Sequence, residues 1–131
     1  MTSSDAAAWG LAALLGGAGV AHFVRPGFFD AIVPHALPGP PRAWTYLSGL
    51  AELACAAGTA RPCTRRAGAT AAAFVFVAVF PANVQMAVDW RARPVIERVF
   101  AYGRLPLQVP LVVWALRVRS DSRSGRRRGE G

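Results

Sequence analysis

The chain has 131 residues, of which 53% are hydrophobic and 17% charged, and it carries a net charge of +8. Soluble domains carry about 25% charged residues on average, so this composition argues against an ordinary soluble protein, and the length allows no more than one domain. All fifteen basic residues are arginines, and six of them lie in the last fifteen residues. No basic surface with interleaved aromatic residues precedes that tail, which argues against nucleic-acid binding.

Four stretches are nearly free of charge and are predicted to be helices: 6–24, 43–60, 67–88 and 99–116. Each approaches the roughly 20 apolar residues that cross about 30 Å of hydrocarbon. The first and third contain no charged residue, and the second and fourth contain one each, Glu52 and Arg104. The third also lacks the polar face that a soluble helix repeats every turn. The sequence therefore predicts an all-α integral membrane protein.

The leader MTSSDAAAW contains Asp5 and no basic residue, so it lacks the positively charged start of a secretory signal peptide, and the first helix is predicted to be retained. The connection that follows, 25–42, holds five prolines, which forbid one continuous helix. It also contains an apolar group, Phe28, Phe29, Ile32 and Val33. This group predicts that part of the connection lies in the membrane interface or folds onto the mouth of the bundle.

The two later connections are short, which predicts an antiparallel, up-down four-helix bundle. This bundle is predicted to fill one domain, 1–118, followed by a disordered basic tail, 119–131. Placing both termini in the cytoplasm puts nine arginines inside and six outside, so this orientation is predicted. The abundance of alanine and arginine favours a bacterial source, and therefore the bacterial inner membrane.

The polar residues of the predicted helices fall in one half of the bilayer. At a rise of 1.5 Å per residue, Glu52 and Gln108 lie about 13 Å deep, and Asn83 and Arg104 about 7 Å deep, all from the same outer side. His22 lies near the end of the first helix at that boundary, and Ser48 precedes Glu52 by one turn. The candidate site is therefore a polar cluster of His22, Ser48, Glu52, Asn83, Arg104 and Gln108. The inner half of every span is expected to be nearly bare of polar side chains other than small hydroxyl groups.

Two interpretations of this cluster stay open on the residues alone. In the structural one, Glu52 and Arg104 form a buried ion pair that fixes the register of the helices. In the functional one, the same groups line a pocket that opens outward for a small polar or quinone-like headgroup, since ionisable residues inside membranes often mark function. Arg104 also has a stem long enough to snorkel to the membrane surface.

Backbone and packing signals occur in the same helices. Pro81 is expected to free the carbonyl of Val77, which must then find a partner on a neighbouring helix or an ordered water. Small residues repeat at four-residue spacing, a pattern typical of close helix packing in lipid. They are Ala13, Gly17 and Ala21 in the first helix and Ala54 and Gly58 in the second.

No catalytic residue is predicted. Cys55 and Cys63 form no C-x-x-C pair, and no nucleotide-binding or nucleophile motif is present. His22 and His35 have no further ligand at metal-binding spacing, so no metal is expected.

The chain contains four motifs in order: AGVAHFVRPGFFDAIVPHALPGP, YLSGLAELACAAG, FPANVQMA and RLPLQVPLVVWA. Together they resemble the DoxX-like family of small four-helix bacterial membrane proteins. The resemblance implies a polar set at His22, Pro26, Glu52, Asn83, Arg104 and Gln108. Some members of that family act beside another protein in the quinone-coupled oxidation of sulfur compounds, which implies a quinone as ligand and an oxidoreductase as partner. The thiol-handling branches would be better matched by paired cysteines, which this chain lacks.

The primary hypothesis is an accessory subunit of a membrane redox system, not an enzyme on its own. It would lie in the lipid bilayer and bind a quinone or similar molecule in its outer half. The alternative is a purely structural membrane anchor or partner-binding module with no ligand. A third hypothesis, a small transporter, requires a homo-oligomer, because one four-helix chain does not enclose a path.

Overall fold

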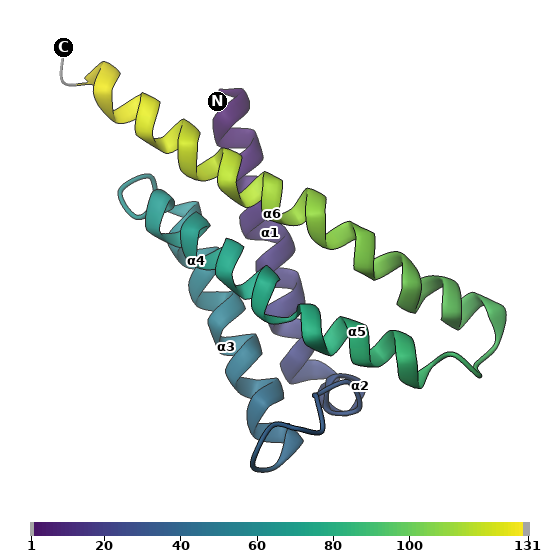
Figure 1. Cartoon of the computed structure of the whole chain (residues 1–131). Helices are drawn as coiled ribbons and strands as arrows, with labels where there is room; N and C mark the ends of the chain where they lie inside the picture. Colours follow the sequence, from purple (N-terminus) through teal and green to yellow (C-terminus); the bar gives the residue numbers. More distant parts are fainter. Residues whose placement is uncertain (1, 130–131) are drawn as a thin grey trace.

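The computed structural model describes residues 2–129, which form helices and turns without any strand. The helices are α1 (Ser3–Val24), α2 (Pro26–Asp30), α3 (Pro41–Ala60), α4 (Arg65–Ala78), α5 (Phe80–Asp89) and α6 (Val95–Gly129) (Figure 1). The predicted all-α fold class is therefore confirmed. Residue 1 and residues 130–131, the end of the predicted tail, lie outside the described part of the chain.

Local chemistry accounts for where several helices begin. In α1, the side chain of Thr2 accepts a hydrogen bond from the backbone of Asp5, and the Asp5 carboxylate accepts one from the backbone of Thr2. This reciprocal capping box satisfies two backbone donors of the first turn. α3 begins at Pro41, whose fixed φ suits the first turn and whose missing N–H has no partner to lose there.

The predicted third helix is present but broken. α4 ends at Ala78, Val79 links the two segments, and α5 begins at Phe80, so that Pro81 lies in the first turn of a new helix. Because proline has no N–H to continue the ladder, the break just before it follows from the sequence. Pro106 and Pro110, in contrast, lie inside the continuous α6.

Three helical segments are long and apolar enough to cross a membrane: Ser3–Val24, Arg65–Asp89 and Val95–Ser122. The segment Arg65–Asp89 combines α4 and α5. α3 has 20 residues, which is also enough for a span, but it falls short of these segments in hydropathy. Large apolar side chains are exposed along the three segments, among them Trp9, Phe74, Val109 and Val113. Such a surface is compatible with contact to a lipid bilayer.

The helices pack in a chain of neighbours. α1 packs along α3, α3 along α4, and α4 along α6, while α6 makes a smaller contact with α1. The main core lies between α1, α3, α4 and α6 and is built around Leu11, Leu15 and Phe76. Towards the other end, α5 and the first turns of α6 diverge from the end of α1 and the start of α3 (Figure 1). A second, smaller core of Ile32, Met86 and Ala101 lies there.

The connection between α1 and α3 covers this second core, as its apolar residues predicted. Ile32 is buried against Met86 and Ala101, and Phe29 packs on the same group. Phe28 stays partly exposed but meets Trp90 edge-on, with ring centroids 6.1 Å apart. Since these contacts hold the connection on α5 and α6, it folds onto the open end of the bundle.

Glycine allows close approach of helices at two points, only one of which the spacing pattern indicated. A Cβ on Gly49 of α3 would lie 2.7 Å from the Cβ of His22 on α1. A Cβ on Gly68 of α4 would lie 2.5 Å from the backbone carbon of Gly58. Gly17, by contrast, has nothing within 4 Å of such a Cβ, and Ala13 and Ala54 are exposed. The predicted stripe on the first helix therefore faces outward, and only Gly58 of the predicted set packs closely.

The predicted tail from residue 119 is wrong as far as the structure describes it, because α6 continues to Gly129. Arginine is a good helix former, and no proline follows Pro110. Extending an existing helix needs no new nucleus, so this polar segment continues it.

Candidate functional site

His22 and Glu52 meet where α1 and α3 come closest. The Nδ1 atom of His22 lies 3.1 Å from Oε2 of Glu52, and each residue is only 8% exposed. The contact depends on Gly49, since any side chain there would collide with His22. The sequence predicted both residues for the site, and the structure brings them together.

The hydrogen bonds of this pair are incomplete. His22 Nδ1 lies 2.7 Å from the carbonyl oxygen of Ala18. Because a carbonyl only accepts, Nδ1 must carry the proton and donate it there. Glu52 Oε2 is buried and has no hydrogen-bond partner among the described residues. Burying a polar oxygen without a donor costs about 1–3 kcal/mol, and more for a charged group.

The predicted ion pair between Glu52 and Arg104 is wrong as a direct contact. Arg104 Nη1 instead lies 3.8 Å from the sulfur of Met86, and its guanidinium lies 5.6 Å from the ring centre of Phe100. The position of a residue along a helix does not say which way its side chain faces. The side chain of Glu52 on α3 faces α1, while that of Arg104 on α6 faces α5. Arg104 is still near enough to Glu52 for the two charges to attract each other. We call His22, Glu52 and Arg104 the outer cluster.

Asn83 and Gln108 form a separate pair between α5 and α6. Asn83 Nδ2 donates to Gln108 Oε1 over 3.1 Å, and Gln108 Nε2 donates to the carbonyl of Phe76. That carbonyl lies just before the break caused by Pro81, one residue from the predicted Val77. The pair therefore ties α6 to α5 and, through the carbonyl of Phe76, to the last turn of α4. It also borders an apolar cavity of about 330 Å³, lined by Val77, Phe80, Leu105, Gln108, Val109, Val112 and Val113.

The six predicted residues thus separate into three groups that do not form one site. His22, Glu52 and Arg104 gather in the outer cluster, and Asn83 and Gln108 form their own pair. Ser48 is half-buried one turn before Glu52. Spacing along the chain indicated which residues are polar at this depth, but not which ones face each other.

An aromatic cover lies over the outer cluster. The ring of Phe29 stacks on His22 with centroids 3.7 Å apart and planes 19° from parallel. Phe28 meets Phe29 edge-on at 5.2 Å, and Phe28 in turn meets Trp90. These residues come from α2 and the end of α5, so the segment that closes the bundle also shields His22.

Polar contacts hold this cover in place. Gln85 Nε2 donates to the carbonyl of Val33 over 2.9 Å, and Gln85 Oε1 accepts from the backbone N–H of His35 over 3.0 Å. Asp30 accepts from Thr45 Oγ1 at 2.6 Å and from Arg42 Nε at 2.8 Å. The hydrogen bond from Thr45, helped by Arg42, holds the pKa of Asp30 below its usual range. Gln85 was visible as a polar residue in an apolar stretch, but nothing in the sequence paired it with residues 33–35.

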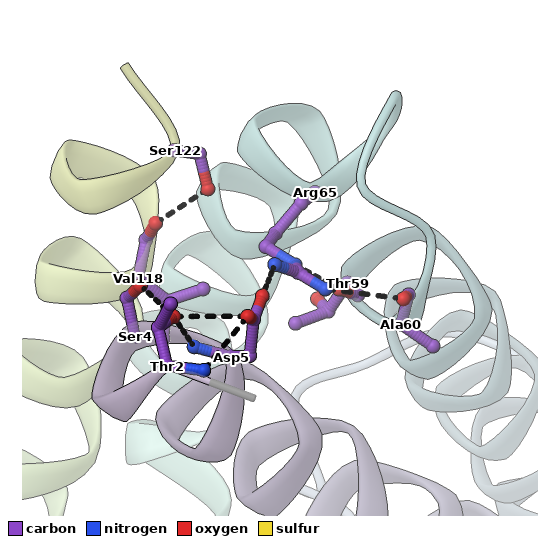
Figure 2. A network of polar contacts seen from close by, with 8 residues as sticks. All are labelled: Thr2, Ser4, Asp5, Thr59, Ala60, Arg65, Val118 and Ser122. Atoms are coloured by element: carbon purple, nitrogen blue, oxygen red, sulfur yellow. Dashed lines mark hydrogen bonds and ion pairs between the residues drawn. The ribbon is translucent and has the colours of Figure 1, made fainter. Parts of the chain in front are cut away.

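The other end of the molecule holds a buried arginine, Arg65, whose burial was not predicted from the sequence. Arg65, only 9% exposed, donates from Nη1 to Asp5 Oδ1 at 2.8 Å and from Nε to the carbonyl of Thr59 at 3.0 Å (Figure 2). Its Nη2 donates to the carbonyl of Ala60 at 3.3 Å. We call these four residues the Arg65 clamp. Asp5 and Arg65 both lie just outside the predicted spans; the signal in the sequence was Asp5, a lone acid before the first span.

The Arg65 clamp has a plain structural role. The last carbonyls of α3 have no partner within their own helix, and a cation there also meets the negative end of the helix dipole. Arg65 satisfies the carbonyls of Thr59 and Ala60 and ties the end of α3 to the start of α1 through Asp5. Each of the three guanidinium nitrogens has a partner, whereas the buried hydroxyl of Thr59 has none among the described residues.

Comparison with known proteins gives a family without a described activity. Residues 11–119 match the model of a domain of unknown function, DUF8561. No curated protein and no solved structure matches the chain. The match spans all the described helices except the first turns of α1 and the end of α6. The chain therefore belongs to the DUF8561 family.

Proposed function

We propose that this chain is a DoxX-like, four-helix protein of a bacterial inner membrane that binds a quinone-type headgroup at its outer cluster. It would serve as an accessory subunit of a membrane redox system, beside an oxidoreductase partner. Both termini would lie in the cytoplasm, with α3 as the fourth membrane helix. The order of the four motifs along the chain supports the DoxX-like assignment.

The single observation that carries the ligand proposal is the free carboxylate oxygen of Glu52. It is buried and lies 3.1 Å from Nδ1 of His22, but it forms no hydrogen bond of good geometry among the described residues. Buried polar atoms almost always have a partner, so an exception requires an explanation. A ligand that completes the hydrogen bond supplies one, and the nearby guanidinium of Arg104 supplies a second recognition group.

A purely structural membrane anchor is the competing function. The Arg65 clamp serves as a comparison, because it is a buried polar group that only holds helices together. A cluster that only locks helices should satisfy its own polar groups, as Arg65 does with Asp5 and two carbonyls. The outer cluster leaves one oxygen of Glu52 without a hydrogen bond. We therefore expect that replacing the Glu52 carboxylate costs little stability.

Binding of a short-chain quinone tests the proposal. The purified protein in detergent is titrated with ubiquinone-1, and bound quinone is separated and quantified, for the wild type, Glu52→Gln and Arg104→Gln. The matched control is Glu97→Gln, which makes the same chemical change at a half-exposed carboxylate paired with Arg93 at 3.5 Å. Saturable binding that is weakened in both cluster variants and kept in the control is expected.

Two results would remove the proposal. One is no saturable binding to the folded wild type by either redox form of the quinone. The other is binding of equal strength in the wild type and both cluster variants, because the ligand would then lie elsewhere. Loss of the folded state in both cluster variants would favour the structural anchor.

A further inference from the structure

Positive charge gathers at one end of the molecule. The two chain ends and the turn between α3 and α4 lie at that end (Figure 1). The segments 2–5, 61–66 and 117–129, which lead to these points, contain nine arginines and two acidic residues, Asp5 and Asp121. The rest of the described chain contains six arginines and four acidic residues. We call the end formed by these three segments the basic end.

Contacts between helices bring the three segments together. Trp114 Nε1 on α6 donates to the carbonyl of Ala7 on α1 over 3.0 Å, and Val118 is buried in the main core one turn later. Arg65, in the first turn of α4, donates to Asp5 of α1. Figure 2 shows the last turns of α6 next to the start of α1 and Arg65. The start of α1 therefore contacts both arginine-bearing segments, and their charges share one end of the bundle.

Most of the charge at the basic end has no counter-charge. Arg65 is neutralised by Asp5, but Arg61, Arg66 and Arg117 are exposed, and none of the three forms an ion pair within residues 2–129. Asp121, exposed on α6, forms none there either. Like charges on one surface repel each other, so an anion bound among them is favoured.

The position of these arginines along the helices indicates which anion they meet. Arg66 is the second residue of the apolar segment Arg65–Asp89, and Arg117 lies five residues before the end of Val95–Ser122. At 1.5 Å per residue, both lie within about 8 Å of the end of a segment able to cross a membrane. Lipid phosphates occupy that depth, and the long stem of arginine extends its guanidinium towards them. A nucleic acid would have to displace the headgroups to reach the same groups.

We propose that the basic end binds the phosphates of anionic phospholipids in the leaflet around it, through the exposed side chains of Arg61, Arg66 and Arg117. A guanidinium donates two parallel hydrogen bonds to a phosphate, so this chemistry fits arginine. The proposal goes beyond the proposed function, since it requires a membrane but neither a quinone nor one orientation of the chain. Each arginine near an anionic surface is expected to raise lipid affinity about fivefold, and salt screens the effect.

Titration with two lipids that differ in headgroup charge tests the proposal. The full chain in dodecyl maltoside micelles at low salt is titrated with dioleoyl phosphatidylglycerol or with the zwitterionic dioleoyl phosphatidylcholine, and bound lipid is counted by native mass spectrometry. The double variant Arg66→Gln/Arg117→Gln is compared with Arg25→Gln/Arg91→Gln. The control pair is also exposed, forms no ion pair among the described residues and changes the net charge equally.

The wild type and the control are expected to bind phosphatidylglycerol at least about tenfold more tightly than phosphatidylcholine, and Arg66→Gln/Arg117→Gln is expected to lose about tenfold of that affinity or more. Raising the salt to about 0.5 M should weaken the preference of the wild type.

Three results would overturn the proposal. One is equal affinity of the wild type for the two lipids. Another is a loss in Arg25→Gln/Arg91→Gln as large as in Arg66→Gln/Arg117→Gln, or a loss in neither, because the exposed arginines of the basic end would then not select the lipid. The third is displacement of phosphatidylglycerol by a short DNA duplex in the same assay, which would assign the surface to nucleic acid.

Discussion

Two of the buried polar groups, the Arg65 clamp and the outer cluster, differ in how completely their charged side chains are hydrogen-bonded. In the Arg65 clamp, the guanidinium donates to a carboxylate and to two helix-end carbonyls. In the outer cluster, Glu52 lies beside His22 with one oxygen lacking a donor, and Arg104 contacts a sulfur and an aromatic ring. Burial alone therefore does not give a polar residue its role. A hydrogen-bonded buried group stabilises the fold, whereas an unsatisfied one costs stability, so its presence calls for a role other than stability.

Removing the clamp arginine should have the largest effect on stability. Arg65→Ala leaves Asp5 without its cation and two carbonyls of α3 without a donor. Breaking a fully buried ion pair costs about 3–5 kcal/mol, and the partial exposure of Asp5 lowers the expected loss to about 2–3 kcal/mol. Reversible unfolding in mixed detergent micelles measures it. The exposed neighbour is the control, and a loss as large for Arg66→Ala would show that the clamp is not special.

Adding a side chain at the close contact between α1 and α3 should disturb the packing of the outer cluster. Gly49→Ala places a Cβ 2.7 Å from that of His22, so the helices must separate, at a cost of about 1–3 kcal/mol. Gly17→Ala is the matched control: nothing lies near its Cβ, and the helix gains up to about 1 kcal/mol from lower chain entropy. The same unfolding assay compares the two. Equal stability for both variants would contradict the close contact at Gly49.

A smaller effect should appear at low pH, at the segment that covers the cluster. The folded pKa of Asp30 lies below its ordinary value of 3.8, mainly because Thr45 donates to the carboxylate. A lowered folded pKa stabilises the fold above the unfolded pKa, and this contribution is lost as the pH falls through the folded value. Unfolding measured from pH 6 to pH 3 should therefore show a decline that is smaller in Asp30→Asn, where only the contribution of Asp5, whose pKa is lowered to about 2, remains. Thr45→Val should reduce the decline; an identical decline in all three proteins would rule out this role of Asp30.

Much of the fold could be predicted from local patterns. Length and hydropathy located the helical segments, and the apolar residues of the 25–42 connection predicted that it folds onto the bundle. The missing N–H of proline predicted a disturbance of the helix at Pro81. The carbonyl that accepts a hydrogen bond from a neighbouring helix is, however, that of Phe76 and not that of Val77. The extent of α6 was missed, because composition suggested disorder where the helix simply continues.

The site was harder to predict than the fold, for a geometric reason. The rise per residue gives the position of Glu52 and Arg104 along their helices, but the direction of each side chain depends on how its helix is rotated against its neighbours. That rotation is set at contacts such as Gly49 against His22, which the spacing of small residues did not indicate. Arg65 lies in the short connection between the second and third predicted helices, whereas its partners Asp5 and Thr59 come from α1 and α3.

The most direct test of the contrast between the outer cluster and the Arg65 clamp is the free energy of unfolding of Glu52→Gln. It is measured without ligand, beside the wild type in the same detergent. This variant removes a buried charge whose hydrogen bonds are incomplete, while keeping the shape of the side chain. We predict a stability within about 1 kcal/mol of the wild type, or above it. A loss of about 2 kcal/mol or more, as expected for Arg65→Ala, would contradict the account, because Glu52 would then hold the helices together as the clamp does.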